Sequence, residues 1–211
     1  MISRQPLRDQ IYQEVLALIY RGELPPGSRV RDTTMAAQLG VSRTPVREAL
    51  LRLAREGTLE ADMGRGFSVP VLRPEEMREI GQILAALECL ALELSAEIPA
   101  DRLLRLREID RELAALRGDV DRSVELDEEW HRTLLSGCPN TRLRAMITNL
   151  WQVPSRYMRA YLRDAGRVTL STQHHASILE ALRRNDRVTA GERFQHHWHR
   201  GIEELGAWIA R

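Results

Sequence analysis

The sequence of 211 residues has no lysine and only two cysteines, Cys89 and Cys138. The cysteines are far apart and form no C-x-x-C pair, which argues against a disulfide-stabilised scaffold and against a thiolate zinc site. All of its 31 basic residues are arginines. We therefore interpret the cysteines as two ordinary reduced thiols.

Long apolar runs are also missing, although 43% of the residues are hydrophobic. No segment of about 18 apolar residues is present, so we expect no membrane span and no membrane partner. The N-terminus "MISRQPLRDQ" lacks the apolar stretch of a secretory signal. These two absences predict a folded protein of the cytoplasm, with enough apolar residues for one or two cores.

Charge and aromatic content divide the chain into two parts. Residues 1–73 contain 11 arginines and eight acidic residues, a net charge of +3, whereas residues 74–211 have a net charge of −2. All six histidines and all four tryptophans follow residue 129. A boundary near "VPVLRPEE" accounts for both changes, and we predict domains at 1–72 and 73–211.

The first domain has the pattern of a winged helix-turn-helix. Apolar residues at helical spacing in "PLRDQIYQEVLALIYRGEL" predict one helix, and two shorter helices follow in "DTTMAAQLG" and "VSRTPVREALLRLAREG" around a glycine-containing turn. The segment "GTLEADMGRGFSVPV" reads as a two-stranded hairpin, the wing.

The second helix of such a motif enters the major groove of DNA by its N-terminal end. That end contains Ser42, Arg43, Thr44 and Arg47, and the two arginines are four residues apart on one face. In the wing, Arg65 between two glycines allows close approach to the DNA backbone. The alternative is a solvated charged face on a small helical bundle.

The second domain shows no strand pattern. Its amphipathic segments predict a six-helix bundle, so that the whole protein is mostly α, and we expect Pro154 to kink the fourth helix. The predicted helices cover residues 75–97, 100–117, 119–136, 140–164, 168–184 and 186–209.

An acid and an imidazole, Asp127 and His131, lie within the apolar stripe of "VELDEEWHRTLL". By helical phase, His175 and His197 also point into the bundle, whereas His174, His196 and His199 point away. Burying a carboxylate without a partner costs on the order of several kcal/mol.

A divalent cation bound by Asp127, His131, His175 and His197 would remove this cost. A metal-free polar core held by hydrogen bonds is the competing interpretation.

"GELPPGSRV" followed by "LGVSRTPVREALLRLAREG" resembles the N-terminal domain of GntR-type bacterial transcription regulators of the FadR-like branch. This resemblance implies that the positions matching Arg43, Thr44, Arg47 and the wing residue Gly64 contact DNA. Thr33 stands where many relatives have a charged DNA-contacting residue.

"DEEWHRTLL", "HHASILEALRRND" and "FQHHW" are similar to the signature segments of the FCD effector domain. In that family the matching aspartate and three histidines bind a metal, often zinc or nickel, near a pocket for small organic acids. The resemblance therefore implies zinc, with nickel or manganese as alternatives. Leu84 stands where relatives typically have an arginine that pairs with the acid. The resemblance therefore implies an effector that is less acidic or held mainly by the metal.

The sequence thus predicts a homodimeric, ligand-responsive transcription regulator, a repressor that binds pseudo-palindromic operator DNA. Dimerisation follows from the two half-sites, about one helical turn apart. Two alternatives stay open. One is a metal-dependent hydrolytic enzyme that uses the three histidines and the aspartate, although we expect no enzyme, and the other is a metal-free regulator.

Overall fold

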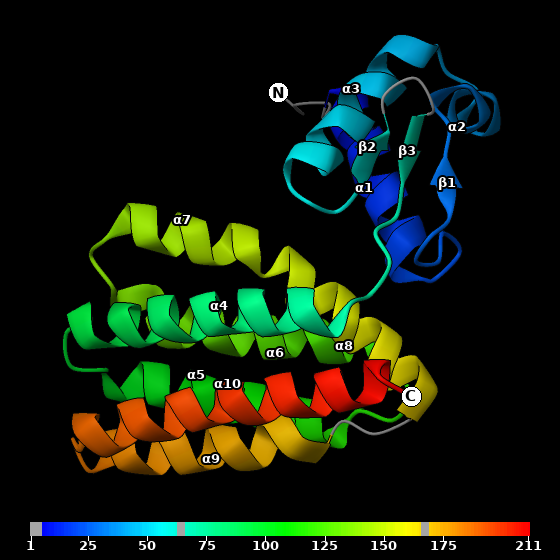
Figure 1. Cartoon of the computed structure of the whole chain (residues 1–211). Helices are drawn as coiled ribbons and strands as arrows, with labels where there is room; N and C mark the ends of the chain where they lie inside the picture. The colour runs from blue at the N-terminus through cyan, green and yellow to red at the C-terminus, as the bar shows by residue number, and fades with distance from the viewer. Residues whose placement is uncertain (1–5, 63–65, 166–168) are drawn as a thin grey trace. The chain divides into compact units, whose positions relative to one another are not determined.

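The computed structural model describes residues 6–62, 66–165 and 169–211. Contacts within the chain separate two compact units, Met1–Leu72 and Arg73–Arg211 (Figure 1). The elements of the first unit are α1 (Leu7–Tyr20), β1 (Arg29–Val30), α2 (Asp32–Leu39), α3 (Arg43–Arg55), β2 (Glu60–Asp62) and β3 (Gly66–Ser68).

Helices α1 and α3 pack against each other and form the core of the first unit. Val15 of α1 and Leu50 and Leu53 of α3 have no exposed side-chain area. Helix α2 ends at Gly40, whose φ of 66° is left-handed and suits glycine. The chain therefore turns directly into α3, and α2 and α3 form the helix-turn-helix.

The strands form one antiparallel sheet in the order β1-β3-β2. The hairpin of β2 and β3 is the expected wing, and β1 adds a third strand through the pairing of Arg29 with Ser68. At Gly66 the φ is +99°, and a Cβ atom would lie 3.3 Å from the carbonyl oxygen of Val30. Glycine is therefore required where the hairpin meets β1.

The second unit is helical throughout its described residues. Its elements are α4 (Pro74–Leu94), α5 (Ala100–Ala115), α6 (Val120–Leu134), the 3-10 turn η1 (Leu135–Gly137), α7 (Thr141–Leu150), α8 (Gln152–Ala165), α9 (Thr169–Arg183) and α10 (Arg187–Ile209). No described helix combines the length and the apolar character needed to cross a bilayer.

Helix α10 packs along α4 and α9, α5 packs against α6 and α9, and α6 contacts α8 (Figure 1). The α4–α10 contact is close at Gly81, where a Cβ atom would lie 2.4 Å from Cγ1 of Ile202. Trp130, Tyr157 and Phe194 are the largest fully buried side chains of the bundle. This packing brings α4, α5, α6, α9 and α10 around one interior.

The predicted fold class is confirmed: a mostly α protein with an N-terminal winged helix-turn-helix and a C-terminal helical bundle. The single kinked helix predicted for residues 140–164 is wrong in detail, because α7 and α8 are separate helices that meet at Trp151. Pro154 has no N–H to bond the carbonyl of Leu150 in the preceding turn. The chain breaks at that point and Pro154 lies in the first turn of α8.

Candidate functional site

The leading end of α3 presents polar side chains to solvent. The opposite face of the helix is buried in the unit's core. Ser42, Arg43, Thr44 and Arg47 are exposed, with 64% of the Arg43 side chain and 59% of the Arg47 side chain accessible. The four predicted residues at the leading end of α3, with Ser42 as the N-cap, are therefore all accessible.

Asp32, the first residue of α2, holds the two arginines in place. Its Oδ2 atom lies 3.2 Å from Nη2 of Arg43 and 3.2 Å from Nη1 of Arg47. Burial raises the pKa of Asp32, but the hydrogen bonds from Arg43 and Arg47 outweigh burial and lower it overall. One carboxylate thus orients both guanidinium groups on the same side of α3.

A groove of about 730 Å³ lies beside this pair and is lined by residues of the sheet, α2 and α3. Its charged lining residues are Arg29, Arg31, Arg43, Arg47, Asp32 and Asp62. The lining has four arginines against two acids, so the groove is electropositive and suits a polyanion. Gly64 and Arg65, the predicted wing residues, lie outside the described residues.

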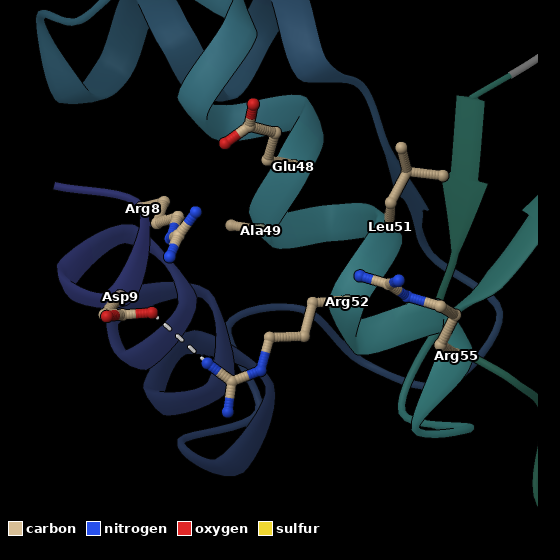
Figure 2. A pocket seen from close by; sticks show the side chains of 7 residues that line it. All are labelled: Arg8, Asp9, Glu48, Ala49, Leu51, Arg52 and Arg55. Atoms are coloured by element: carbon tan, nitrogen blue, oxygen red, sulfur yellow. Dashed lines mark hydrogen bonds and ion pairs between the residues drawn. The ribbon is translucent and has the colours of Figure 1, made fainter. Parts of the chain in front are cut away.

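Arg52 lies on a different side of α3 and has a structural role. It donates a hydrogen bond to Asp9 at 3.3 Å and one to Glu56 at 3.0 Å, and its guanidinium carbon lies 4.1 Å from the centre of the Tyr12 ring. Figure 2 shows the cleft between α1 and α3 in which the ion pair with Asp9 forms. Arg52 thus joins α3 to α1.

In the second unit, three imidazoles from α6, α9 and α10 converge. His131, His175 and His197 each place one ring nitrogen within 4.8 Å of the nitrogens of the other two. Nε2 of His131 lies 3.1 Å from Nε2 of His197. Oδ1 of Asp127 lies 3.7 Å from Nε2 of His175. The structure therefore brings the three predicted histidines together, and Asp127 lies beside His175 but outside the group of ligand atoms within 4.8 Å of one another among the described residues.

A buried carboxylate from α4, Glu88, fixes the orientation of His131. Its Oε2 lies 2.7 Å from Nδ1 of His131, and its two oxygens also accept hydrogen bonds from the indole nitrogens of Trp151 and Trp198, both at 2.7 Å. Because a carboxylate only accepts, Nδ1 of His131 has the hydrogen. In the neutral ring, Nε2 then presents its lone pair toward His197.

Asp110 of α5 has the same relation to His175. Its Oδ1 lies 2.8 Å from Nδ1 of His175, on the side of the ring away from Asp127. Burial and the nearby carboxylate of Asp127 raise the pKa of Asp110 to about 7. Two crowded carboxylates of this kind are stabilised by positive charge between or beside them.

Aromatic side chains surround the three histidines. Trp130 stacks on His175 with ring centres 3.7 Å apart and planes at 3°, and Phe194 lies parallel to His197. Trp151 and Trp198 stand edge-on to His131 at 4.8 and 5.6 Å. These rings limit the access of water to the cluster.

The pKa of His131 is shifted in the opposite direction from those of His175 and His197. Burial lowers the pKa of His131, but the charge and hydrogen bond of Glu88 outweigh burial and raise it above the ordinary histidine value. Burial lowers the pKa of His175 and of His197 well below that value, and neighbouring imidazoles lower both further. His175 and His197 are therefore neutral rings with a lone pair to donate.

The cluster fits a metal in two respects. Nε2 of His175 is buried and has no hydrogen-bond partner among the described residues, which costs free energy unless a ligand satisfies it. Metal–nitrogen bonds of about 2.0–2.1 Å place neighbouring ligand atoms roughly 3 Å apart. The observed separations of 3.1 and 3.7 Å are close to that spacing.

Sequence reasoning missed Glu88 and Asp110. Glu88 lies one turn after Leu84, whose side chain is fully buried, and Asp110 lies one turn after the buried Leu106. Each acid therefore falls in the apolar stripe of its helix. The helical-phase argument that identifies Asp127 applies equally to both.

The remaining histidines are nearer to the surface. His174 is half-buried, whereas His196 and His199 are exposed. His199 pairs with Glu203 at 3.2 Å. None of the three belongs to the group of ligand atoms within 4.8 Å of one another among the described residues.

Two family descriptions match the chain. The one for bacterial regulatory proteins of the gntR family covers residues 7–69, and the one for the FCD domain covers residues 79–200. The chain is 31% identical over 176 residues to the Nta operon transcriptional regulator of Aminobacter aminovorans, which covers 78% of this chain and 79% of that protein.

Two further comparisons extend over almost the whole chain. It is 27% identical over 200 residues to the HTH-type transcriptional regulator YdhC of Bacillus subtilis, or 93% of this chain and 89% of that protein. The solved structure of E. coli McbR/YncC has a TM-score of 0.79 at 24% identity and covers 96% of this chain and 98% of that one. The likeness to that structure concerns the fold.

The three hydrogen bonds accepted by Glu88 predict that Glu88→Gln is destabilising. The glutamine amide would turn a donor toward an indole or imidazole N–H and leave a buried group unpaired, at a cost of about 1–3 kcal/mol in the free energy of unfolding. Urea denaturation measures this difference. Glu93→Gln, on an exposed position of the same helix, is the matched control, with an expected change within about 0.5 kcal/mol. Equal stability of the two variants would contradict the role of Glu88.

Proposed function

The chain belongs to the GntR family of bacterial regulatory proteins and has an FCD domain, and we propose that it is a metal-dependent, effector-responsive repressor. It acts as a homodimer on pseudo-palindromic operator DNA in the cytoplasm. The observation that carries the proposal is the presence in one chain of two sites: an exposed arginine pair on a helix-turn-helix and a buried three-histidine cluster. The first suits DNA and the second suits a metal.

For DNA binding, the proposal assigns base contacts to Arg43 and Arg47. Both guanidinium groups are more than half exposed and stand one helical turn apart on α3. Arginine forms two parallel hydrogen bonds with the edge of guanine in the major groove. Ser42 and Thr44 offer hydroxyls to phosphates beside them, and in the wing Gly64 and Arg65 approach the DNA backbone.

Replacing Arg43 or Arg47 by alanine should weaken specific DNA binding by roughly 1–3 kcal/mol for each base that the missing guanidinium no longer binds. Fluorescence anisotropy with operator and random duplexes of equal length measures the change. Arg55→Ala is the matched control, because it removes the same charge from the exposed C-terminal end of α3. The assignment fails if all three variants weaken binding equally, or if neither Arg43→Ala nor Arg47→Ala weakens it.

For the metal, the proposal assigns His131, His175, His197 and Asp127 as ligands. Support comes from the buried Nε2 of His175, which has no hydrogen-bond partner among the described residues, and from the carboxylates of Glu88 and Asp110, which lie within hydrogen-bond distance of the Nδ1 atoms of His131 and His175. Carboxylates in that position fix the tautomer of metal-binding histidines. Zinc is the ion that we propose, with nickel and manganese as alternatives.

Because the ion binds the folded state, chelation should lower the melting temperature, by an amount equivalent to about 2.7 kcal/mol where free metal had been 100 times its Kd. His131→Ala should abolish both the metal content and the metal-dependent shift. His199→Ala, at an exposed histidine, should preserve them. Elemental analysis and melts with and without zinc, nickel and manganese measure both quantities.

If the wild type contains no metal and none of the three ions stabilises it, the cluster is a hydrogen-bonded polar core. The metal-dependent difference in melting temperature is the relevant quantity, since His131→Ala also removes the partner of Glu88. Removing that partner destabilises the fold in every condition. This destabilisation is the same with and without metal, so it does not contribute to the difference between the two melting temperatures of one variant.

The proposed effector is a small organic acid. The three histidines and Asp127 would supply four ligand atoms. An ion that binds five or six ligands would then have open positions, which a carboxylate can occupy. Leu84 is fully buried and offers no positive charge, so the ion takes over the role of a pairing arginine. Melting temperatures measured with small carboxylic acids added test this. An acid should raise the melting temperature of the metal-loaded protein and leave that of the metal-free protein unchanged.

Dimerisation is assigned to the outer face of α4. Ile83, Leu90 and Leu94 are 46%, 42% and 44% exposed and follow one another at intervals of seven and four residues, which places them on one stripe. Met146, 54% exposed, belongs to α7, which packs beside α4. A second copy of the chain would cover this apolar surface and supply the winged helix-turn-helix that binds the second half-site of the operator.

Leu90→Glu should convert the dimer into a monomer, because two buried carboxylates would face each other across the two-fold axis. Analytical ultracentrifugation measures the mass. Leu104→Glu on α5, where the leucine is 53% exposed, is the matched control and should leave the mass unchanged. A monomeric wild type, or a Leu90→Glu variant that dimerises as the wild type does, would exclude this interface.

A hydrolytic enzyme is the second candidate. A general base would have to lie beside a metal-bound water. The buried carboxylates of Glu88 and Asp110 both face imidazole N–H groups, which suits orienting groups better than bases. We therefore favour the regulator.

A further inference from the structure

Two histidines outside the proposed ligand set form a row with those inside it. The ring centres of His196 and His174 are 5.8 Å apart, and those of His174 and His197 are 5.7 Å apart. From His197 the next steps are 5.0 Å to His175 and 5.1 Å to His131. The row thus leads from His196 through His174 to His197, which neighbours both His175 and His131, and each step is between 5.0 and 5.8 Å.

The burial of these rings increases along the row. His196 is exposed, His174 and His197 are partly buried, and His131 and His175 are at most 1% accessible. The row therefore runs from solvent to the interior of the bundle. It connects the surfaces of α9 and α10 with the cluster.

Apolar aromatic rings cover much of the remaining surface of the cluster. Trp130 covers His175, Phe194 lies beside His197, and Trp151 and Trp198 border His131. A divalent cation that sheds its water in an apolar layer incurs a large desolvation cost. Nitrogen ligands a few ångströms apart avoid this cost, because each new bond forms as a water or a previous ligand leaves.

We propose that His196 and His174 form the access route by which a divalent transition-metal ion reaches and leaves the three-histidine site. The ion first binds the exposed imidazole of His196 together with His174. It is then transferred to His197 and finally held by His131 and His175 as well. This inference rests on the metal site proposed above.

The route predicts an effect on rates and none on affinity. The outer pair offers two imidazoles near solvent, whereas the inner site offers three imidazoles and Asp127 in the interior. At equilibrium the ion therefore occupies the inner site. Removing the outer pair raises the barrier for binding and release alike and leaves the ratio of the two rates unchanged.

The test compares the wild type, the double variant His174→Gln/His196→Gln and the control His199→Gln, all as full-length metal-free protein. Co²⁺ is the probe, because its visible absorption reports ligand binding. Stopped-flow mixing gives the rate of uptake, excess chelator gives the rate of release, and titration gives the Kd. Glutamine preserves size and polarity but is a poor ligand for these ions.

The expected result is that uptake and release both slow by on the order of tenfold in the double variant, with an unchanged Kd and unchanged rates in His199→Gln. Unchanged rates in the double variant would overturn the route and direct attention to the side of Asp110, whose side chain is 15% accessible. A weakened Kd would also overturn it, since the outer histidines would then be ligands. A wild type that binds no Co²⁺ would instead show that the metal site itself is wrong.

Discussion

The hydrogen bonds of one buried carboxylate, Glu88, determine how the interior of the helical unit is arranged. Its two oxygens accept from an imidazole and two indoles that come from α6, α10 and the junction of α7 and α8. A carboxylate with no access to water is tolerable only where its lone pairs are used in this way. One of these bonds orients His131 toward His197. The hydrogen bonds that the buried carboxylate requires therefore also set the geometry of the proposed metal site.

The winged helix-turn-helix repeats this arrangement on a smaller scale. Asp32 lies at the start of α2 and holds Arg43 and Arg47 of α3 at 3.2 Å, much as Glu88 and Asp110 hold the rings of His131 and His175. In each unit, an acid on one helix orients nitrogen donors on another. The guanidinium groups are directed outward, on the surface proposed to contact DNA, and the imidazoles are directed inward, toward the proposed metal site.

Helical periodicity in the sequence was enough to predict that the protein is mostly α and that Asp127, His131 and His175 are buried. The phase of α6 places Asp127 and His131 on the buried face, and both are buried. Helical phase also places Glu88 and Asp110 in the apolar stripes of their helices, but which histidine each acid faces depends on packing, and this the sequence does not show. Pro154 was recognised as a point of distortion, but the sequence did not show that the helix divides at Trp151 into α7 and α8.

The proposed regulation depends on a divalent metal among the three histidines. Anomalous diffraction from crystals of the purified protein, measured above and below the absorption edge of the bound element, locates such an ion. We expect one strong anomalous peak about 2.0–2.1 Å from ring nitrogens of His131, His175 and His197, with Asp127 as a further ligand. A peak elsewhere, or none while the rings hydrogen-bond to one another and to water, would show that the cluster is not a metal site.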